Sequence, residues 1–305
     1  MDSVKKDCFS NNIALGVDIG KTKIAVGAVD PVTKAISFFL QDFQTIKTKD
    51  AILDTTSRLI ETALKNYPTV DVGVGVFGVV DHCKGTIISS RYIDGWKDFN
   101  LAAFLRSRFG FSNITIDNDV IVAAVGEYWL NYDGKNISIF SAGTSIGIGS
   151  IINGKIFRGS HNLSGQIAHL NSFDKKHTIS QLCGGKGISD RLYDELGIRV
   201  GAKEIIESAQ NNECNIAKNI VEEAAHIIAK VIILIQNMLD PNVIICSGSL
   251  LSCNEYFYDL VLSNLSEYPQ CYLENNNKLL NIVKSDISQH IGILGGVALC
   301  KKYVI

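Results

Sequence analysis

The sequence predicts an α/β protein with two related α/β domains around a central cleft. Apolar runs of strand length alternate with longer stretches in which apolar residues recur at helical spacing. This order of strands and helices starts twice along the chain, and in each half a glycine-containing turn joins two early strands. A chain of 305 residues, with 46% hydrophobic and 20% charged residues, is long enough for about two domains with their own cores.

The first half is predicted to begin with three strands and then to alternate helices with strands. Within the first helical stretch, Ile52, Leu59, Ile60 and Leu64 recur at the spacing that places them on one face. The predicted strands are residues 14–18, 24–29, 36–40, 70–76 and 114–116, and the predicted helices are residues 51–66, 101–109 and 120–130.

The second half opens in the same way, with predicted strands at residues 137–140, 147–152, 155–157 and 243–246. An apolar helix is expected at residues 227–239. It is shorter than the ~20 residues of a membrane span, so we interpret it as a core helix. Pro241 ends it, because the residue before a proline disfavours helical geometry. Residues 291–303 are expected to form a final helix that docks on the rest.

The two halves are expected to pack closely, because no linker rich in proline or serine separates them. Sequence identity between the halves is weak, so their origin by duplication is a hypothesis. The expected domains are residues 1–118 together with about 288–305, and residues 119–287.

Charge and cysteine content exclude several classes of partner. The formal net charge is -2 and the lysines are scattered, which gives no surface for nucleic acid or an anionic membrane. The first twelve residues lack the apolar stretch of a secretory signal. The eight cysteines are dispersed without a C-x-x-C pair, as in reduced thiols. We therefore expect a cytoplasmic protein.

Two turns have the composition of phosphate-binding turns. Asp18, Gly20 and Thr22 offer a carboxylate, a flexible backbone and a hydroxyl within one turn, and Gly143-Thr144 opens a second glycine-rich turn that reaches Gly149. Glycine lets backbone N–H groups approach an anion, and a carboxylate can hold the metal of Mg-ATP. Taken alone, such a turn favours a plain hairpin over a phosphate site.

A polar tripeptide, Asp117-Asn118-Asp119, separates a short strand from the start of a helix. One interpretation is simple helix capping, since these residue types satisfy the free N–H groups of a helix start. The other makes Asp119 a general base that takes a proton from a substrate hydroxyl, while Asn118 positions a neighbouring hydroxyl.

A third polar group follows in the second half. Gln166 and His169 are three residues apart, so on a helical turn both side chains could face one pocket and bind a polyol. The segment from Cys183 to Asp190 follows, with three glycines among its eight residues.

In this order and spacing, the motifs resemble those of the ROK family (repressors, open reading frames and kinases). The resemblance covers nearly the whole chain and implies the actin-like ATPase, or ribonuclease H-like, fold. The segments that carry it are residues 18–23, 75–78 with Asp81, 94–96, 118–119 with 123–127, 143–149, 153–155, 158–159, 165–169 and 247–248.

The resemblance also implies roles for individual residues. Asp119 would be the catalytic base, and Asp18 would hold Mg²⁺ through the nucleotide. The expected sugar-binding residues are Gly78, Asn118, Asp119, Gln166, His169 and Asp190. The expected ATP-binding residues are Asp18, Gly20, Lys21, Thr22, Lys23, Gly143, Thr144, Gly147 and Gly248, with Gly248 near the adenosine.

The chain departs from the family pattern at several of these positions. Lys21 stands where the family usually has glycine, and we favour an added phosphate contact over an exposed turn residue. Phe77 replaces a proline, Tyr92 an asparagine, and Gln166 and Asp190 replace glutamates, so the sugar pocket is expected to be reshaped.

The family's zinc site is also incomplete. Of its one histidine and three cysteines, His169 and Cys183 remain, whereas Gln181 and Ile188 occupy the other two positions. A tetrahedral structural site needs four nitrogen or sulfur ligands. We therefore expect no structural zinc.

The resemblance implies an enzyme, an ATP:sugar 6-phosphotransferase that acts on a hexose or an N-acetylhexosamine and forms a homodimer. Gln166 in place of glutamate is a detail shared with bacterial N-acetylmannosamine kinases, which makes N-acetylmannosamine the first choice. Glucose, N-acetylglucosamine or another aminosugar are the alternatives.

A non-catalytic sugar-sensing regulator is the alternative of another class. Such repressors carry a DNA-binding module ahead of the sugar domain, and the first strand here is expected by about Ile13. Asp119 and both phosphate turns favour the kinase.

Overall fold

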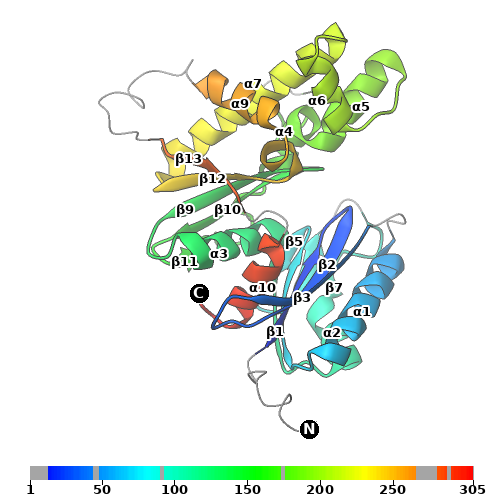
Figure 1. The fold of residues 1–305 in the computed structure, drawn as a ribbon, viewed down its shortest axis with the longest axis vertical. Helices are drawn as coiled ribbons and strands as arrows, with labels where there is room; N and C mark the ends of the chain where they lie inside the picture. Colours follow the sequence, from blue (N-terminus) through cyan, green and yellow to red (C-terminus); the bar gives the residue numbers. More distant parts are fainter. Residues whose placement is uncertain are drawn as a thin grey trace, which may run out of the picture. The chain divides into compact units, whose positions relative to one another are not determined.

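The computed structural model describes residues 13–43, 48–89, 93–172, 176–265, 280–286 and 290–304. The chain divides into two compact units, Met1–Asp133 with Gln289–Ile305, and Gly134–Ser288. Each unit contains a five-stranded sheet flanked by helices (Figure 1). The predicted α/β class with two related domains is confirmed.

In the first unit the strand order is β3-β2-β1-β4-β8. The first three strands are antiparallel neighbours, whereas β4 and β8 run parallel to β1. The strands are β1 (Ala14–Ile19), β2 (Lys23–Val29), β3 (Ile36–Phe43), β4 (Asp71–Val76) and β8 (Asn113–Asn118). The helices are α1 (Lys49–Asn66), α2 (Leu101–Phe109), α3 (Asp119–Asn131) and α10 (Ile291–Cys300).

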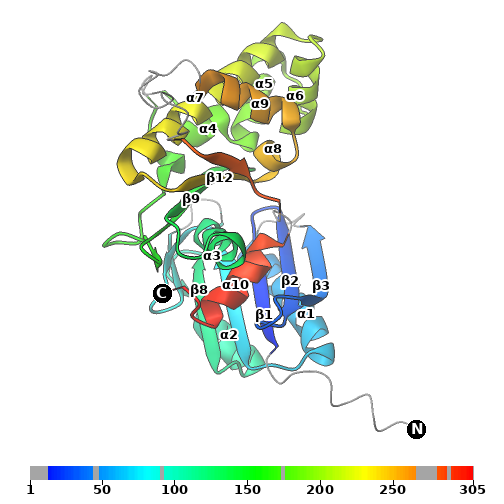
Figure 2. The ribbon, with the colours of Figure 1, turned by 60° about the vertical axis from the view of Figure 1, so that its left-hand side comes forward.

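The two faces of this sheet differ in composition because successive side chains of a strand point to opposite sides. One face carries branched side chains such as Val17 and Val74, which pack with α1 and α2 into one hydrophobic core. The other face carries glycines, and α3 and α10 lie against it (Figure 2). A Cβ on Gly73 would lie 1.7 Å from the carbonyl oxygen of Gly296 in α10.

A small three-stranded sheet, β5-β6-β7, belongs to the same unit and was not expected. Its strands are β5 (Val79–Asp81), β6 (Thr86–Ser89) and β7 (Phe99–Asn100). They are too short to show the alternating pattern that identifies a strand. Trp96, in the loop before β7, is fully buried and stacks on Phe77 at a ring distance of 5.6 Å.

The sheet of the second unit repeats the first one strand for strand, in the order β11-β10-β9-β12-β13. Three antiparallel neighbours again precede two strands that run parallel to the third. The strands are β9 (Ile137–Ala142), β10 (Ile146–Ile152), β11 (Lys155–Ile156), β12 (Val243–Ser247) and β13 (Ile282–Lys284). The shared topology agrees with the predicted relationship between the halves.

Helices of the second unit gather on its sheet around the long α7, which carries much of the core. They are η1 (Ile167–His169), α4 (Ile179–Cys183), α5 (Gly185–Leu196), α6 (Ala202–Gln210), α7 (Asn215–Leu239), α8 (Ser249–Ser252) and α9 (Glu255–Leu265). As expected, α7 ends before Pro241, with Asp240 in the left-handed conformation. Within the described residues, no helix combines the length and apolar character that crossing a bilayer requires.

The division between the units falls after Asp133, whereas the sequence placed it between Asn118 and Asp119. The reason is that α3 packs against α10 within the first unit. A Cβ on Gly295 would lie 1.8 Å from the carbonyl oxygen of Val122, so the two helix backbones touch. The helix that begins at Asp119 therefore stays with the sheet that precedes it.

We predict that the glycine-lined face tolerates no side chain. Gly73→Ala should lower the free energy of unfolding by about 3 kcal/mol, because its Cβ would meet the backbone of α10. Gly110→Ala is the control: its φ is 71° with nothing within 4 Å, so only backbone strain of about 1 to 2 kcal/mol is expected. Urea unfolding measures both, and equal losses would contradict the close approach.

Candidate active site

The polar residues of the first unit gather where its parallel strands end. Asp18 in β1 is paired with Gly75 in β4, and Gly75 is paired with Asp117 in β8, so the three form one row across the sheet. The turn of residues 20–23, Gly78 and the start of α3 follow directly. Carboxyl ends of parallel strands are the usual position of binding sites in α/β proteins.

The turn between β1 and β2 is tight. Gly20 N–H donates to the carbonyl oxygen of Lys23 at 2.9 Å, and a Cβ on Gly20 would lie equally close to that oxygen. Thr22 is exposed at the tip, while Lys21 and Lys23 are partly buried. The turn therefore presents a hydroxyl and two ammonium groups near the end of β1.

Asp18 and Asp119 form a pair of interacting carboxyl groups. Desolvation, and then the charge of Asp119, raise the pKa of Asp18 from 3.8 to about 7, although Lys23 opposes the shift. Desolvation also raises the pKa of Asp119, although Lys21 and the N–H of Val120 oppose it. A raised pKa makes a carboxylate a stronger proton acceptor, which suits a general base.

Asn118 is the N-cap of α3, as the capping interpretation predicted. Its Oδ1 accepts from the N–H groups of Val120 and Ile121 at 3.0 and 3.4 Å, and its Nδ2 donates to the carbonyl oxygen of Gly78 at 2.9 Å. A carboxamide has two N–H bonds, and the Asn118 side chain also hydrogen-bonds the Asp119 carboxyl group, which opposes the rise in the pKa of that group. Asn118 therefore both caps α3 and orients Asp119.

The start of α10 lies against Asp18. A Cβ on Gly292 would fall 2.7 Å from the carboxyl carbon of Asp18, so only glycine leaves room for this side chain. The sequence analysis did not select Gly292. The Ile-Gly-Ile-Leu-Gly-Gly pattern of residues 291–296 was the available signal, because closely spaced glycines in an apolar helix indicate close packing.

In the second unit, the turn after β9 is oriented by α5. The N–H groups of Gly185 and Lys186 donate to the carbonyl oxygens of Gly143 and Thr144 at 2.8 and 3.1 Å. Because a trans peptide directs its C=O and N–H to opposite sides, the N–H groups of Thr144 and Ser145 point away from α5. Such paired N–H groups can bind an anion.

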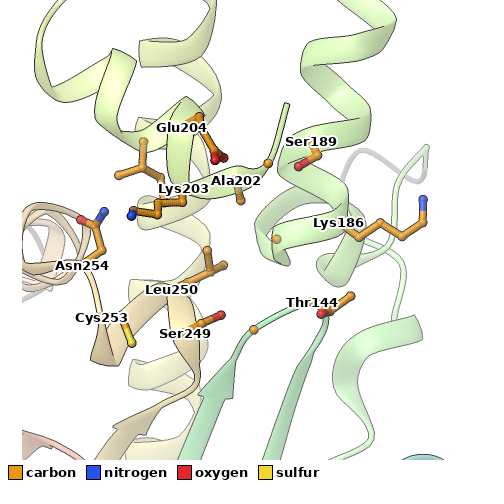
Figure 3. A pocket seen from close by; sticks show the side chains of 14 residues that line it. Thr144, Lys186, Ser189, Ala202, Lys203, Glu204, Ser249, Leu250, Cys253 and Asn254 are labelled. Carbon is orange, nitrogen blue, oxygen red and sulfur yellow. The ribbon is translucent and has the colours of Figure 1, made fainter. Parts of the chain in front are cut away.

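This turn opens into a cavity of about 530 Å³ (Figure 3). The figure shows Thr144 and Ser249 near the strand ends, and Lys203 with Asn254 on another side. The cavity is lined by Gly143, Thr144, Gly185, Lys186, Ser189, Gly201, Ala202, Lys203, Glu204, Ile206, Ser249, Leu250, Cys253 and Asn254.

Of the four nucleotide-binding residues expected in this unit, Gly143 and Thr144 line the cavity. Gly248 directly precedes the lining residue Ser249, and a Cβ on Gly248 would lie 2.3 Å from the carbonyl oxygen of Ala142. Gly147 is not a lining residue; it lies in β10, paired with Ser141 of β9. The other lining side chains come from α5, α6 and the α8 segment, and no local sequence pattern connects them.

The three sugar-binding residues expected in the second unit lie outside the cavity lining. Gln166 is the residue before the 3-10 turn η1, and His169 is the last residue of that turn. Asp190 forms an ion pair with Lys186 one turn earlier in α5. Tyr92 lies outside the described residues.

The residues at the former zinc positions do not fit a zinc ion. Gln181 completes a capping box with Thr178, and Ile188 is fully buried in the core. Burial raises the pKa of the Cys183 thiol to about 12, whereas zinc binds the thiolate. Within the described ranges, no group of three or more histidine, cysteine or acidic side chains is arranged to hold a metal.

Comparison with known proteins identifies relatives along the whole chain. The model of the ROK family matches residues 14–303. A glucokinase of Streptomyces coelicolor is 24% identical over 320 residues, covering 95% of this chain and 98% of that protein. A xylose repressor of Caldicellulosiruptor bescii is 25% identical over 211 residues, covering 67% of this chain and 51% of the repressor.

Solved structures share the fold. A ROK family glucokinase from Streptomyces griseus, in complex with glucose and AMPPNP, has a TM-score of 0.79 at 22% identity and covers 95% and 99% of the two chains. A Listeria monocytogenes protein proposed to be an N-acetylmannosamine kinase has a TM-score of 0.78 at 20% identity, covering 95% and 98%. These structures support the actin-like ATPase fold.

We predict that Asp18 makes the metal-free protein less stable as the pH rises. Between about pH 4 and 7 the folded protein keeps a proton on Asp18 that the unfolded chain has lost, so the free energy of unfolding falls with rising pH. Asp18→Asn should remove this loss and be more stable at pH 7.5 by about 2 to 4 kcal/mol.

The measurement is urea unfolding at pH 5 and pH 7.5 with EDTA present. Asp54→Asn, an exposed position on α1, is the matched control and should leave the wild-type pH dependence unchanged. If Asp18→Asn shows the same pH dependence as the wild type, then Asp18 is not a protonated buried carboxyl group.

Proposed function

The chain belongs to the ROK family, and we propose that it is an ATP-dependent sugar kinase. It would phosphorylate the 6-hydroxyl of a hexose or an N-acetylhexosamine, with N-acetylmannosamine as the first candidate. The observation that carries the proposal is the carboxyl pair Asp18 and Asp119, with raised pKa values, at the carboxyl edge of the first sheet.

Asp119 would act as the general base. Its carboxylate takes the proton from the 6-hydroxyl as that oxygen forms a bond to the γ-phosphorus of ATP. The bond between the γ-phosphorus and the bridging oxygen breaks, and ADP leaves with the electron pair. The N–H of Val120 donates to Asp119 Oδ1 at 3.0 Å and fixes its orientation.

The two turns and the cavity would hold the nucleotide. Thr22, Lys21 and Lys23 of the first turn, and the N–H groups that follow Gly143, are suited to phosphate oxygens. The 530 Å³ cavity has the volume for a base and ribose. Asp18 is the carboxylate suited to hold Mg²⁺, which would supply positive charge to offset that of the phosphates.

The identity of the sugar is proposed from the residues expected to contact it. Asn118, whose side chain hydrogen-bonds Gly78 and Asp119, would face the sugar hydroxyls, and Gln166, His169 and Asp190 would supply further polar groups. Gln166 replaces a family glutamate, which favours N-acetylmannosamine. Glucose and N-acetylglucosamine or another aminosugar are the competing substrates.

A sugar-sensing regulator is the second candidate, because repressors are among the relatives. The presence of Asp119 together with both glycine-containing turns favours the kinase, since a protein that only binds a sugar needs neither a base nor a phosphate site. A cytoplasmic location and a homodimer belong to the same proposal, and light scattering tests the dimer.

We predict that one sugar supports turnover and that Asp119→Asn lowers kcat by about 100-fold or more, because the amide cannot accept the proton. The measurement is ADP release from MgATP with N-acetylmannosamine, N-acetylglucosamine, glucose, mannose, glucosamine and kanosamine. Sugar affinity of the variant should stay close to that of the wild type.

Two outcomes would count against this assignment. Full turnover by Asp119→Asn would exclude Asp119 as the base. Folded protein that binds a sugar of the panel but never releases ADP would favour the regulator.

A separate prediction concerns the cavity. Ala202→Phe should weaken MgADP binding more than tenfold, because Ala202 lies among the lining side chains in Figure 3 and a ring there would occupy the cavity. Gln210→Phe, an exposed residue on the same helix outside the cavity, is the control. Calorimetric titration with MgADP measures both, and unchanged binding by Ala202→Phe would place the nucleotide elsewhere.

A further inference from the structure

Lys186 occupies an electrostatically unfavourable position. It stands in the first turn of α5, where the helix macrodipole is positive and disfavours a cation. Its ammonium group pairs with Asp190, four residues later, and the two side chains are 62% and 45% exposed. A lysine that precedes its acidic partner has the less favourable of the two orientations, and such exposed pairs contribute little. This ion pair does not explain why a lysine stands here.

The backbone of Lys186 is part of the candidate phosphate site. Its N–H donates to the carbonyl oxygen of Thr144, and the residue lines the cavity. Helical side chains leave the backbone leaning toward the N-terminus of their helix, which here is the side of the Gly143-Thr144 turn. In Figure 3 the Lys186 side chain instead extends away from the other lining side chains.

Rotation about the side-chain bonds of Lys186 would bring its ammonium group back toward the turn. There it would meet the phosphates of a nucleotide, together with the N–H groups of Thr144 and Ser145. A phosphate carries more negative charge than one carboxylate, and its position at the start of α5 matches the sign of the macrodipole. An anion at the turn therefore competes well for this lysine.

We propose that Lys186 exchanges partners when the nucleotide binds: it pairs with Asp190 in the free protein and with a phosphate in the complex, which frees the Asp190 carboxylate for the sugar. This inference rests on the proposed function. Its consequence is a coupling between the two ligands, and coupling between binding free energies is reciprocal. MgADP should raise the sugar affinity about 2- to 5-fold, the range that release of an exposed ion pair can supply.

Lys186→Met provides a distinctive test. With no lysine to occupy Asp190, the variant should bind the sugar without nucleotide about as tightly as the wild type does with MgADP. Added MgADP should then have no further effect on sugar affinity, while MgADP itself binds more weakly. A merely structural role for Lys186 would not tighten sugar binding.

Lys203→Met is the matched control. Lys203 lines the same cavity and also pairs with an acid four residues later, Glu207 at 3.7 Å, but it has no contact with Asp190. Calorimetry would compare N-acetylmannosamine, or the sugar that the activity panel selects, with and without MgADP. The proposal expects coupling in the wild type and in Lys203→Met, and none in Lys186→Met. Coupling that persists in Lys186→Met, or disappears in both variants, overturns it.

A second measurement separates this proposal from the assignment of the substrate. Carbon-13 NMR of the Asp190 carboxyl group, assigned with Asp190→Asn, follows the ion pair without any sugar. MgADP should shift this signal in the wild type toward its position in Lys186→Met. An unchanged signal at saturating MgADP overturns the exchange, whereas a shift in a protein that phosphorylates no sugar would sustain it while the proposed substrate fails.

Discussion

The close approach of two helices to a glycine-lined sheet is the constraint on which the candidate site depends. Gly16 and Gly73 leave no space for a side chain between β1, β4 and the backbone of α10, and Gly126 and Gly295 do the same between α3 and α10. Helices this close place their first turns beside the ends of the strands. Asp18 and Asp119 are thereby brought together at one edge, partly out of water.

Partial burial raises the pKa values of these carboxyl groups, and it also makes their ionised forms less stable. An ionised carboxylate loses hydration energy when it is buried, which raises the pKa of Asp18 and of Asp119, and the charge of Asp119 raises the pKa of Asp18 further. Lys23 and Lys21 offset this for Asp18 and Asp119 respectively. Because the two lysines are two residues apart in one turn, the same hairpin that presents Thr22 also moderates both acids. A bound metal ion would lower the pKa values of Asp18 and Asp119, whereas bound phosphates would raise them. The pKa values of the ligand-free site therefore differ from those of the complex.

The sequence was informative where a residue's role follows from its neighbours in the chain. Asp18 stands next to the end of its strand, and Asn118, Asp119 and Thr144 stand in turns or at a helix start, where local composition drew attention to them and the family resemblance suggested their roles. Roles that arise only from tertiary contacts were missed. Gly292 matters because α10 meets β1, and Lys203 lines the cavity because α6 lies near the turn after β9. The pair of Lys186 and Asp190 could be predicted only in part. Their spacing of four residues is evident in the sequence, whereas their position beside the Gly143-Thr144 turn depends on tertiary contacts.

The segment from Gln181 to Asp190 is held in place by packing and capping. Of the four zinc ligands that the family pattern would supply, two are replaced: Gln181 completes a capping box and Ile188 is buried in the core. Hydrogen bonds from Gly185 and Lys186 to the Gly143-Thr144 turn fix the start of α5. Lys186 stands between that turn and Asp190, because its N–H binds Thr144 and its ammonium group pairs with Asp190. In the proposed exchange, a phosphate at the turn would therefore take Lys186 away from Asp190.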